Sequence, residues 1–542
     1  MIPSGDQAPG RELAQQATKE RPFVITADHS KFKELQFTPE QLRTMRGPEV
    51  TKACLGCHNT AGEQFMKTIH WTWRDANVPP EQQVGKGGLT VNNFCVSLKS
   101  NWPRCTSCHA GYGWKDDSFD FNDQTRIDCL VCHEQTGTYK KFPTMSGFPA
   151  AYEADPADPG VQKGKVFPEN GATYYAPDWN AVAQSVSRPT RNNCGTCHFF
   201  GGGGDGVKHG DLDSSMANPD KNLDVHMGSK QSEGQDFDCV RCHSTVAHHI
   251  DGRMYATPAA TERKSLLEND LGSRIMCESC HSATPHQPGS KPNDHTDRVA
   301  CQACHIPAFA RVLPTKMRWD WSTAGQKKDG KPFKVKDEAL HRPSYDSKKG
   351  DFVWKKDVEP EYYWFNGSMT GMTALDVIDP SREVRESWPV GDRSDPNARI
   401  MPFKIHRGKT PYDKVHNTML VPHLFPLGPD DKTAYWKNWD WNAAFAEGQR
   451  MAGLKYSGEY DFVETAWAYP TTHMVAPKDQ ALPCEACHAK QGRLANLTGF
   501  YMPGRDASLA LDTIGWGGLV AALIAVFIHA VARMVTRGRK EG

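Results

Sequence analysis

Eight five-residue windows of the form C-x-x-C-H constrain what this chain can fold into more than any other feature of its sequence. They take up 16 of its 17 cysteines and eight of its 22 histidines. The pattern is the covalent attachment site of a c-type haem, in which two thiols bond to the porphyrin and the adjacent histidine ligates the iron. A zinc site or a redox dithiol would leave the fifth position free to vary. Because all eight windows carry histidine there, the sequence predicts eight covalently bound haems.

The predicted haem-binding residues follow from the motif, and the histidine of each window is the first axial ligand of its iron. These residues are Cys54, Cys57, His58, Cys105, Cys108, His109, Cys129, Cys132, His133, Cys194, Cys197, His198, Cys239, Cys242, His243, Cys277, Cys280, His281, Cys301, Cys304, His305, Cys484, Cys487 and His488.

The composition favours one haem-filled body over several independent domains. Hydrophobic residues make up 38% of the 542 residues, a low share that is expected if porphyrin faces form part of the core. Motifs two to seven are also too closely spaced for separate cores. We therefore predict a mainly α-helical fold with extensive irregular structure, packed around the haems. The 64 basic and 64 acidic residues balance, so nothing indicates nucleic-acid binding.

Local signals predict a few elements. "FTPEQLRTM" predicts a helix with a threonine cap and an early proline before motif one. Between motifs seven and eight, "KPFKVKDEALHRPSYDSKKGDFVWKK" predicts short strands and turns, and "DKTAYWKNWDWNAAFAEGQRMAGL" predicts a helix. The four glycines at 201–204 are followed by no GK[ST], so they indicate a close backbone approach and not a phosphate loop.

The C-terminal region predicts a membrane anchor. "IGWGGLVAALIAVFIHAVA", residues 514–532, has no formal charge and is long enough to cross a bilayer. The basic residues after it predict a cytoplasmic tail. Within the span, His529 is expected near the cytoplasmic interface. We divide the chain into an octahaem domain (1–504), a linker (505–513), a transmembrane helix (514–532) and a basic tail (533–542).

Covalent haem attachment in bacteria takes place outside the cytoplasm, so the octahaem domain is expected on the periplasmic face of the cytoplasmic membrane. The first residues, "MIPSGDQAPGRELAQQ", show neither a charged nor an apolar export region. We expect a signal that is missing from this sequence, or a start codon set too late.

Histidines outside the motifs are numerous enough to give every iron a second axial ligand. We expect these distal ligands from loops near the other haems. The candidates are His29, His70, His226, His248 or His249, His286 or His295, His416 or His423, and His473. A chain with all eight irons held by two histidines would be only an electron conduit.

Cys95 and Lys208 are two further candidate site residues. Cys95 is the one cysteine outside the motifs, ten residues before motif two, and Lys208 follows the glycine run. A desolvated, neutral lysine amine can ligate iron; the alternative is a solvated loop lysine. For Cys95 the alternative is a buried, inert thiol.

The chain resembles the octahaem tetrathionate reductase family of multihaem cytochromes c. The resemblance covers about residues 25 to 305, with the eighth motif after a long gap. The segments that carry it are "CLGCHNTAGEQFMKTIHWTW", "NNFCVSLKSNWPRCTSCHAGYGWKDDSFDF", "IDCLVCHEQTGTYKKFP" and "NCGTCHFFGGGGDGVKHGDLDSSM".

The resemblance implies that the second haem, bound by Cys105, Cys108 and His109, is the catalytic one. In that family a lysine is its distal ligand, and a cysteine and an asparagine line the pocket. Carried over, Cys95 is the pocket cysteine and Asn92 the asparagine. Lys208 is the preferred lysine, with Lys140 and Lys141 as alternatives.

We therefore predict a haem-dependent oxidoreductase that reduces a small sulfur or nitrogen oxyanion, such as tetrathionate, or nitrite or hydroxylamine, with the substrate displacing the lysine or binding beside it. A Cys95 thiolate could take a sulfur atom, provided a neighbouring cation lowers its pKa. The expected redox partner is a quinol-linked membrane subunit or a periplasmic cytochrome. The alternatives are a non-enzymatic conduit with every haem bis-histidine, and a hydroxylamine-oxidising octahaem enzyme.

Overall fold

The structure, a computed structural model, describes residues 11–12, 14–15, 27–75, 78–250, 275–282 and 284–538. The chain forms two compact units, residues 1–481 and residues 482–542. The first unit holds motifs one to seven, and the second holds motif eight and the long C-terminal helix. The domain boundary that we expected at residue 504 therefore falls inside the second unit.

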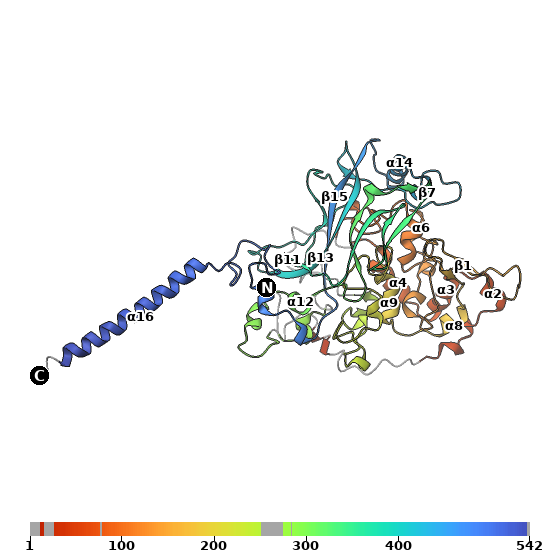
Figure 1. Ribbon diagram of the computed structural model, residues 1–542. Helices are drawn as coiled ribbons and strands as arrows, with labels where there is room; N and C mark the ends of the chain where they lie inside the picture. Colours follow the sequence, from red (N-terminus) through yellow and green to blue (C-terminus); the bar gives the residue numbers. More distant parts are fainter. Residues whose placement is uncertain are drawn as a thin grey trace. The chain divides into compact units, whose positions relative to one another are not determined.

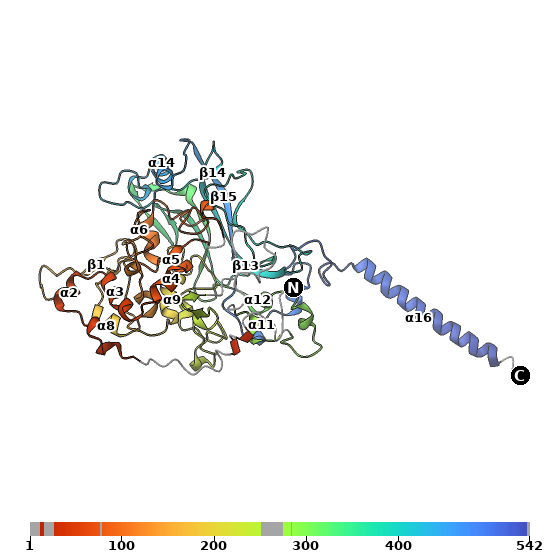
Figure 2. The ribbon, with the colours of Figure 1, turned by 180° about the vertical axis from the view of Figure 1, so that it is seen from behind.

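The part of the first unit that carries the motifs consists of short helices joined by irregular segments (Figures 1 and 2). Most of these helices have only one or two turns, which fits a chain whose ordered packing partners are prosthetic groups. Its helices are α2 (Pro39–Thr44), α3 (Pro48–Cys57), α4 (Ala61–Met66), α5 (Ile69–Thr72), α6 (Trp102–Cys105), α7 (Leu130–His133), α8 (Trp179–Gln184), α9 (Arg191–His198), α11 (Cys277–Cys280) and α12 (Cys301–His305). Two small hairpins, β1 (Lys165–Val166) with β2 (Thr173–Tyr174) and β3 (Thr245–Val246) with β4 (His249–Ile250), accompany them.

Residues 315–470 build a nine-stranded mixed sheet around one long strand, β13. The order is β12-β15-β13-β5-β10-β9-β8, and β11 and β14 also pair with β13. The strands are β5 (Thr315–Asp320), β8 (Lys334–Asp337), β9 (Arg342–Asp346), β10 (Gly350–Lys355), β11 (Glu361–Phe365), β12 (Val384–Ser387), β13 (Arg399–Asp413), β14 (Thr418–Met419) and β15 (Tyr460–Pro470). A separate hairpin joins β6 (Lys327–Lys328) and β7 (Lys331–Pro332).

The sheet corrects the prediction of a mainly α-helical fold. β13 pairs antiparallel with β15 over eleven residues, yet parallel with β5, and β12 pairs parallel with β15. These strands are far apart in sequence, so a local alternation of apolar and polar residues does not predict which of them pair. The local predictions are confirmed: Thr38 caps α2 in a capping box, strands β7 to β10 occupy 331–355, and α13 (Tyr435–Asn438) and α14 (Trp441–Ala452) occupy the predicted helical stretch.

The sheet reaches back to the segment before motif two. The side-chain amide of Asn93 donates to the His406 carbonyl on β13 at 2.8 Å, and the Trp321 indole donates to the Phe94 carbonyl at 2.9 Å. Phe94 is buried with Trp319 and Trp321 in one apolar cluster. The segment that carries Cys95 is therefore fixed by residues more than 200 positions away in sequence.

Helix α14 covers one end of the long strands. Its Asp440 cap accepts the backbone N–H of Ala443 at 3.1 Å. The Trp441 and Phe445 rings then contact Phe462 and Tyr460 at the start of β15, with ring centroids 5.8 and 4.9 Å apart. In both ribbon views α14 lies beyond the end of β13 and β15 (Figures 1 and 2).

The second unit contains α15 (Cys484–Cys487), which carries motif eight, and α16 (Leu509–Gly538). Among the described residues, α16 is the one helix long and apolar enough to cross a membrane, with a mean hydropathy of 2.2 and no buried side chains in its most apolar window. It begins at Leu509, five residues before the apolar span that the sequence defines.

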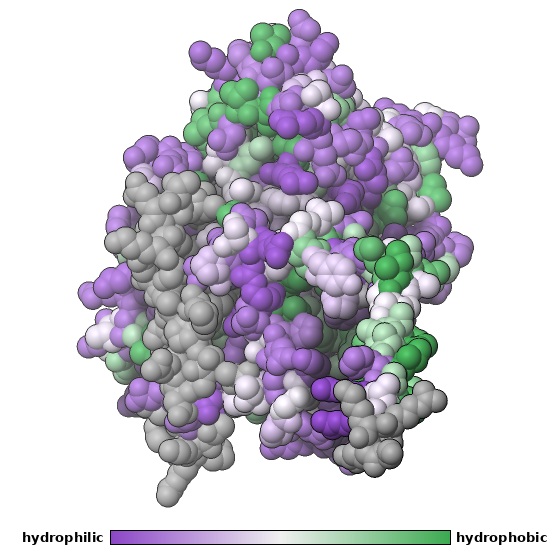
Figure 3. Space-filling view, turned by 90° about the vertical axis from the view of Figure 1, so that its left-hand side faces the viewer, coloured by the Kyte–Doolittle hydropathy of each residue, from purple (hydrophilic) through white to green (hydrophobic). Residues whose placement is uncertain are grey.

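On the face drawn in Figure 3, apolar side chains occur mainly as separate patches among polar ones. Most large aromatic residues are internal instead: Trp71, Trp179, Trp319 and Trp321 are all at most 2% exposed. These tryptophan side chains therefore form part of the core.

One buried carboxylate makes the stability of the sheet depend on pH. Asp413, at the end of β13, accepts the backbone N–H groups of Val415, His416 and Ser457 at 2.7–2.9 Å and the Ser457 hydroxyl at 2.9 Å. Burial alone would raise the pKa of Asp413, but these hydrogen bonds outweigh it and lower the pKa to about 2 from 3.8. Its stabilisation is therefore present above pH 3.8 and is lost as the pH falls towards 2.

We expect Asp413→Asn to lower the free energy of unfolding by about 2 kcal/mol at pH 6, and the difference from the wild type to shrink between about pH 4 and pH 2. Denaturant unfolding followed by circular dichroism measures this. Asp379→Asn, on an exposed turn, is the control and should have little effect at any pH. A deficit that does not depend on pH would contradict the proposed role of the carboxylate.

Candidate functional site

A large internal cavity runs through the first unit. Its volume is about 2440 Å³, several times that of a pocket for one small ligand. Eleven of the motif cysteines line it, from motifs two to seven. A cavity of this size lined with motif thiols fits several covalently held porphyrins.

Six motif histidines each face a second histidine, and four of these pairs line the cavity. A metal–imidazole bond is about 2.0 Å long, so two imidazoles on opposite sides of one metal ion have ring centroids about 6 Å apart. The observed centroid distances are 6.0 to 6.4 Å. The pairs are His58 with His29, His133 with His248, His198 with His70, His243 with His473, His281 with His226, and His305 with His286.

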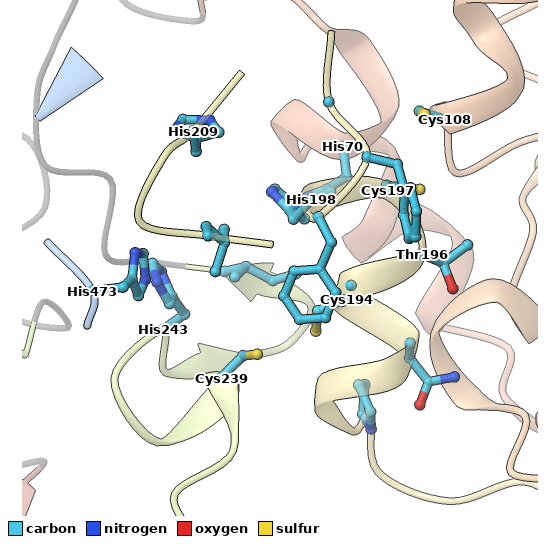
Figure 4. A pocket seen from close by; sticks show the side chains of 18 of the residues that line it. His70, Cys108, Cys194, Thr196, Cys197, His198, His209, Cys239, His243 and His473 are labelled. Carbon is cyan, nitrogen blue, oxygen red and sulfur yellow. The ribbon is translucent and has the colours of Figure 1, made fainter. Parts of the chain in front are cut away.

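Figure 4 shows two of these pairs, with His70 beside His198 and His473 beside His243. In four of the imidazoles, Nδ1 is held by an oxygen, which leaves Nε2 as the nitrogen for a metal. Nδ1 of His133 lies 2.8 Å from the Ser187 carbonyl, and Nδ1 of His248 lies 3.0 Å from Gln64. Nδ1 of His286 and of His473 meet Asn293 at 3.2 Å and Asp211 at 3.1 Å. The donor set therefore fits haem iron.

Motif two differs from these six. In the described chain, the ring contacts of His109 are all with tryptophan and phenylalanine, the nearest being Trp114 at 4.9 Å and Trp71 at 5.1 Å. One ring nitrogen, Nε2, lies 2.7 Å from the Trp71 carbonyl, and Nδ1 is buried without a hydrogen-bond partner. Burial lowers the pKa of His109 to about 3, which keeps the imidazole neutral as a metal ligand must be.

Lys208 lies on the cavity wall close to motif two. It is half-buried, lines the cavity, and its amine lies 5.6 Å from the centre of the Tyr469 ring. Burial, followed by the charge of Lys86, lowers the pKa of Lys208 to about 8, while a Cys108 thiolate would raise it. The amine is therefore within electrostatic range of the motif-two cysteine and loses its proton more readily than an ordinary lysine.

The alternative lysines occupy different environments. Lys141 is buried, forms an ion pair with Asp128 at 3.0 Å and donates to the His109 carbonyl. Because its ammonium is committed to these oxygens, Lys141 supports the backbone of motif two and is not placed as a ligand. Lys140 is exposed.

Cys95 approaches the same motif from another direction. It lines the cavity, and its thiolate would raise the pKa of Cys105, which burial already raises to about 12. Burial also raises the pKa of Cys95 itself, and the charges of four basic residues, Lys349, Arg104, Lys316 and Lys86, offset this only in part. In the protein without substrate, the neighbouring cations therefore do not activate the Cys95 thiol.

The segments of Cys95 and Lys208 are in contact. A Cβ atom on Gly202 would lie 3.2 Å from the Phe94 ring, 2.9 Å from Val207 and 3.4 Å from Cβ of Lys208. Gly202 also has a φ of +77°, which disfavours other residues. The expectation of a close backbone approach in the glycine run is confirmed at this position.

The Asn92 side chain forms hydrogen bonds with the backbone of its own turn. Its side-chain oxygen accepts the N–H groups of Phe94 and Cys95 at 3.1 and 3.2 Å, and its amide donates to the Val96 carbonyl at 3.0 Å. Although Asn92 lines the cavity, these bonds make it a residue that shapes the Cys95 turn.

The distal candidates His416 and His423 require correction. Nδ1 of His423 meets the Ser100 carbonyl at 2.8 Å and Nε2 meets Asp431 at 2.7 Å, so neither nitrogen is available to a metal. His416 is paired with Asp413 at 3.1 Å beyond the end of β13. His249 and His295, the second choices in their pairs, are both exposed.

Thiols of different motifs come together in a definite order. The side chains of Cys54 and Cys129 approach within hydrogen-bonding reach, as do those of Cys108 and Cys197, of Cys194 and Cys239, and of Cys277 and Cys301. Cys242 and Cys280 influence each other by charge. Motif two therefore adjoins motif four, and motifs four to seven follow one another. Figure 4 labels Cys108 of motif two and Cys197 of motif four, the two thiols through which these motifs adjoin.

Sequence reasoning missed several buried polar residues near this site. His209 lies with its ring centroid 5.1 Å from that of Tyr469, His406 stacks on Phe94 at 4.2 Å, and Lys404 is 1% exposed. His209 could have been noticed, since it directly follows Lys208. The other two lie on β13, where nothing in the local sequence indicates proximity to motif two.

Comparison with known proteins agrees with this geometry. The family described as "Cytochrome c bacterial" matches residues 316–491, and the family "Cytochrome c554 and c-prime" matches residues 53–134. The crystal structure of an octahaem cytochrome c from Shewanella oneidensis is 42% identical, with a TM-score of 0.71, and the match covers 87% of this chain and 96% of that one. A protein of Archaeoglobus fulgidus described only as uncharacterised is 22% identical over 242 residues, 37% of this chain and 75% of that one.

The fold and the motif-lined cavity define a multihaem c-type cytochrome, with haem iron held by covalently attached porphyrins. More narrowly, the identity and coverage of the Shewanella structure show that this chain belongs to the octahaem cytochrome c family.

Proposed function

We propose that this cytochrome is a membrane-anchored reductase of small sulfur or nitrogen oxyanions, and that the haem of motif two is its active centre. One observation carries the proposal. Of the seven motifs in the first unit, six have a histidine that faces a second histidine, whereas His109 has no such partner in the described chain, and Lys208 and Cys95 line the cavity beside its cysteines. An exchangeable site at one haem distinguishes an enzyme from a conduit.

When bound, the haems supply single electrons and the iron at which a substrate is reduced. The residues of the chain divide the remaining work. His109 provides the neutral imidazole, and the Lys208 amine, with its lowered pKa, provides a second ligand that a substrate can replace. The proposed distal ligands at the six paired motifs are His29, His70, His226, His248, His286 and His473.

The surroundings of Cys95 favour an anionic substrate. Four basic side chains act on its thiol, and in the described chain the buried Nη1 of Arg104 has no hydrogen-bond partner. Glu169 pairs with Arg104 at 2.8 Å and contacts Lys349 at 3.9 Å, and so neutralises part of this charge. The remaining positive charge attracts oxyanions.

Tetrathionate also suits the thiol. Although burial raises the pKa of Cys95, its thiolate form can attack the central sulfur–sulfur bond, forming a new sulfur–sulfur bond and releasing one thiosulfate. Two electrons then break that new bond, release the second thiosulfate and restore the thiolate. Hydroxylamine reduction needs two electrons and two protons but no thiol. The two substrates therefore make different demands on Cys95.

The order of neighbouring thiols supports a route for electrons. Motif two adjoins motif four, which adjoins motif five, and motifs six and seven continue the series. A periplasmic cytochrome or a quinol-linked membrane subunit would deliver electrons at the far haems. Helix α16, with its exposed apolar side chains, would hold the protein at the membrane.

The first prediction concerns the ligand. Lys208→Ala should convert one low-spin ferric haem to a high-spin or water-ligated state and leave the others unchanged, because it removes one axial donor. Electron paramagnetic resonance of the purified ferric protein measures this. Lys140→Ala, at an exposed lysine, is the control and should leave the spectrum as it is. An unaltered spectrum for Lys208→Ala would favour the bis-histidine conduit.

Cys95→Ala separates the two substrate classes. We expect tetrathionate turnover to fall about a hundredfold or more, the lower end of what a positioned catalytic group typically contributes, while hydroxylamine turnover changes little. The ferric spectrum should stay intact because the thiol is not an iron ligand. Equal losses with both substrates would argue against a chemical role for the thiol.

The anchor is tested by truncation. Removing residues 506–542 should release a soluble protein that carries its full haem content, because every C-x-x-C-H window ends by His488. Membrane fractionation with a haem stain follows both properties. A truncated protein that still sediments with membranes would refute the assignment of α16.

A further inference from the structure

A buried lysine of the sheet holds the backbone from which Lys208 projects. Lys404 lies on β13 and is 1% exposed. Its amine donates to the carbonyls of Val207 and Lys208 at 2.8 and 2.9 Å and to the hydroxyl of Thr315 at 2.6 Å. The Thr315 hydroxyl donates in turn to the Gly206 carbonyl at 2.6 Å. Three consecutive carbonyls, 206 to 208, are thus fixed by two side chains of neighbouring strands.

The pattern of donors shows what these bonds require of Lys404. Both carbonyls can only accept, and the Thr315 hydrogen is already directed at Gly206. Burial lowers the pKa of Lys404 and the charge of Asp211 raises it. With the Thr315 hydrogen in this direction, all three bonds of the amine are donated by it, which only the ammonium form does. Hydrogen bonds from a charged donor are stronger than neutral ones, so this is a firm attachment.

The loop needs such an attachment. Gly202, Gly203 and Gly206 have φ values of +77°, +90° and +67°, and a glycine-rich backbone has many accessible conformations. After Lys208 the chain is tied again, since Asp211 accepts the backbone N–H groups of Thr472 and His473 at 2.8 and 3.0 Å. Lys208 therefore stands between two fixed points, and Lys404 provides the nearer one.

We propose that Lys404 is a positioning residue for the reactive centre: with Thr315 it fixes carbonyls 206–208, and so sets how firmly the Lys208 amine is presented to the haem of motif two. This inference rests on the proposed function, in which Lys208 is the exchangeable ligand. Lys404 itself touches neither substrate nor iron. Its effect is on how readily the lysine leaves its site.

The test measures how fast cyanide binds to the ferric protein, since cyanide must displace the exchangeable ligand. Lys404→Met removes all three donors while keeping a long apolar side chain. We expect cyanide to bind to one haem about tenfold faster, and the electron paramagnetic resonance signal of that haem to broaden, with the others unchanged. Thr315→Val, which nearly conserves volume, should act in the same direction but less.

Lys409→Met is the matched control. Lys409 is likewise a lysine of β13 and is half-buried, but it has no hydrogen bond to loop 206–208 among the described contacts. Its substitution should leave the cyanide rate unchanged. If Lys404→Met does not fold, as judged by haem content, Thr315→Val carries the test.

The outcomes separate the two proposals. If Lys208→Ala removes the distinct haem signal but Lys404→Met and Thr315→Val leave the cyanide rate unchanged, the positioning role is wrong and the proposed function stands. If Lys208→Ala changes no haem signal, the proposed function itself fails. In the double variant Lys208→Ala/Lys404→Met, the rate should equal that of Lys208→Ala alone, because no ligand is left to position.

Discussion

The fixed distance between two imidazoles that share one metal ion governs this protein. Ring centroids about 6 Å apart must be supplied by residues that are often remote in sequence: His198 pairs with His70, and His243 pairs with His473. Because paired histidines come from remote parts of the chain, the segments around the motifs do not form long regular helices. Most helices there have only one or two turns. At motif two, His109 has no such histidine partner in the described chain, and Lys208 and Cys95 line the cavity beside its cysteines.

The sheet is the rigid element behind the motif-two site. It contacts the Cys95 segment through Asn93 and Trp321, and the Lys208 loop through Lys404 and Thr315. A site built on strands is held more closely than one carried only by loops. The sheet thus supports the haem chemistry without carrying a haem-attachment motif itself.

Sequence reasoning succeeded where the signal was local and failed where it was not. The motifs, the Thr38 cap, the strands of 331–355 and helix α14 follow from spacing, capping and alternation. The approach of Lys208 and Cys95 to motif two came from a family resemblance. Lys404 and His406 read as ordinary strand residues, because only the parallel pairing of β13 with β5 and contacts of Asn93 across 313 residues bring them to the site. For His423, the sequence does not indicate that the Ser100 carbonyl and Asp431 lie beside its ring nitrogens.

The internal cavity has a consequence for biogenesis. A chain with about 2440 Å³ of interior lined by motif thiols lacks much of its own core until porphyrins fill it, so haem attachment and folding are one process. Residues that close over the motif-two segment, such as Pro422 against Ser100 and Asn101, are synthesised after motif seven. The enclosure of motif two is therefore complete only when residues from beyond motif seven have packed against it.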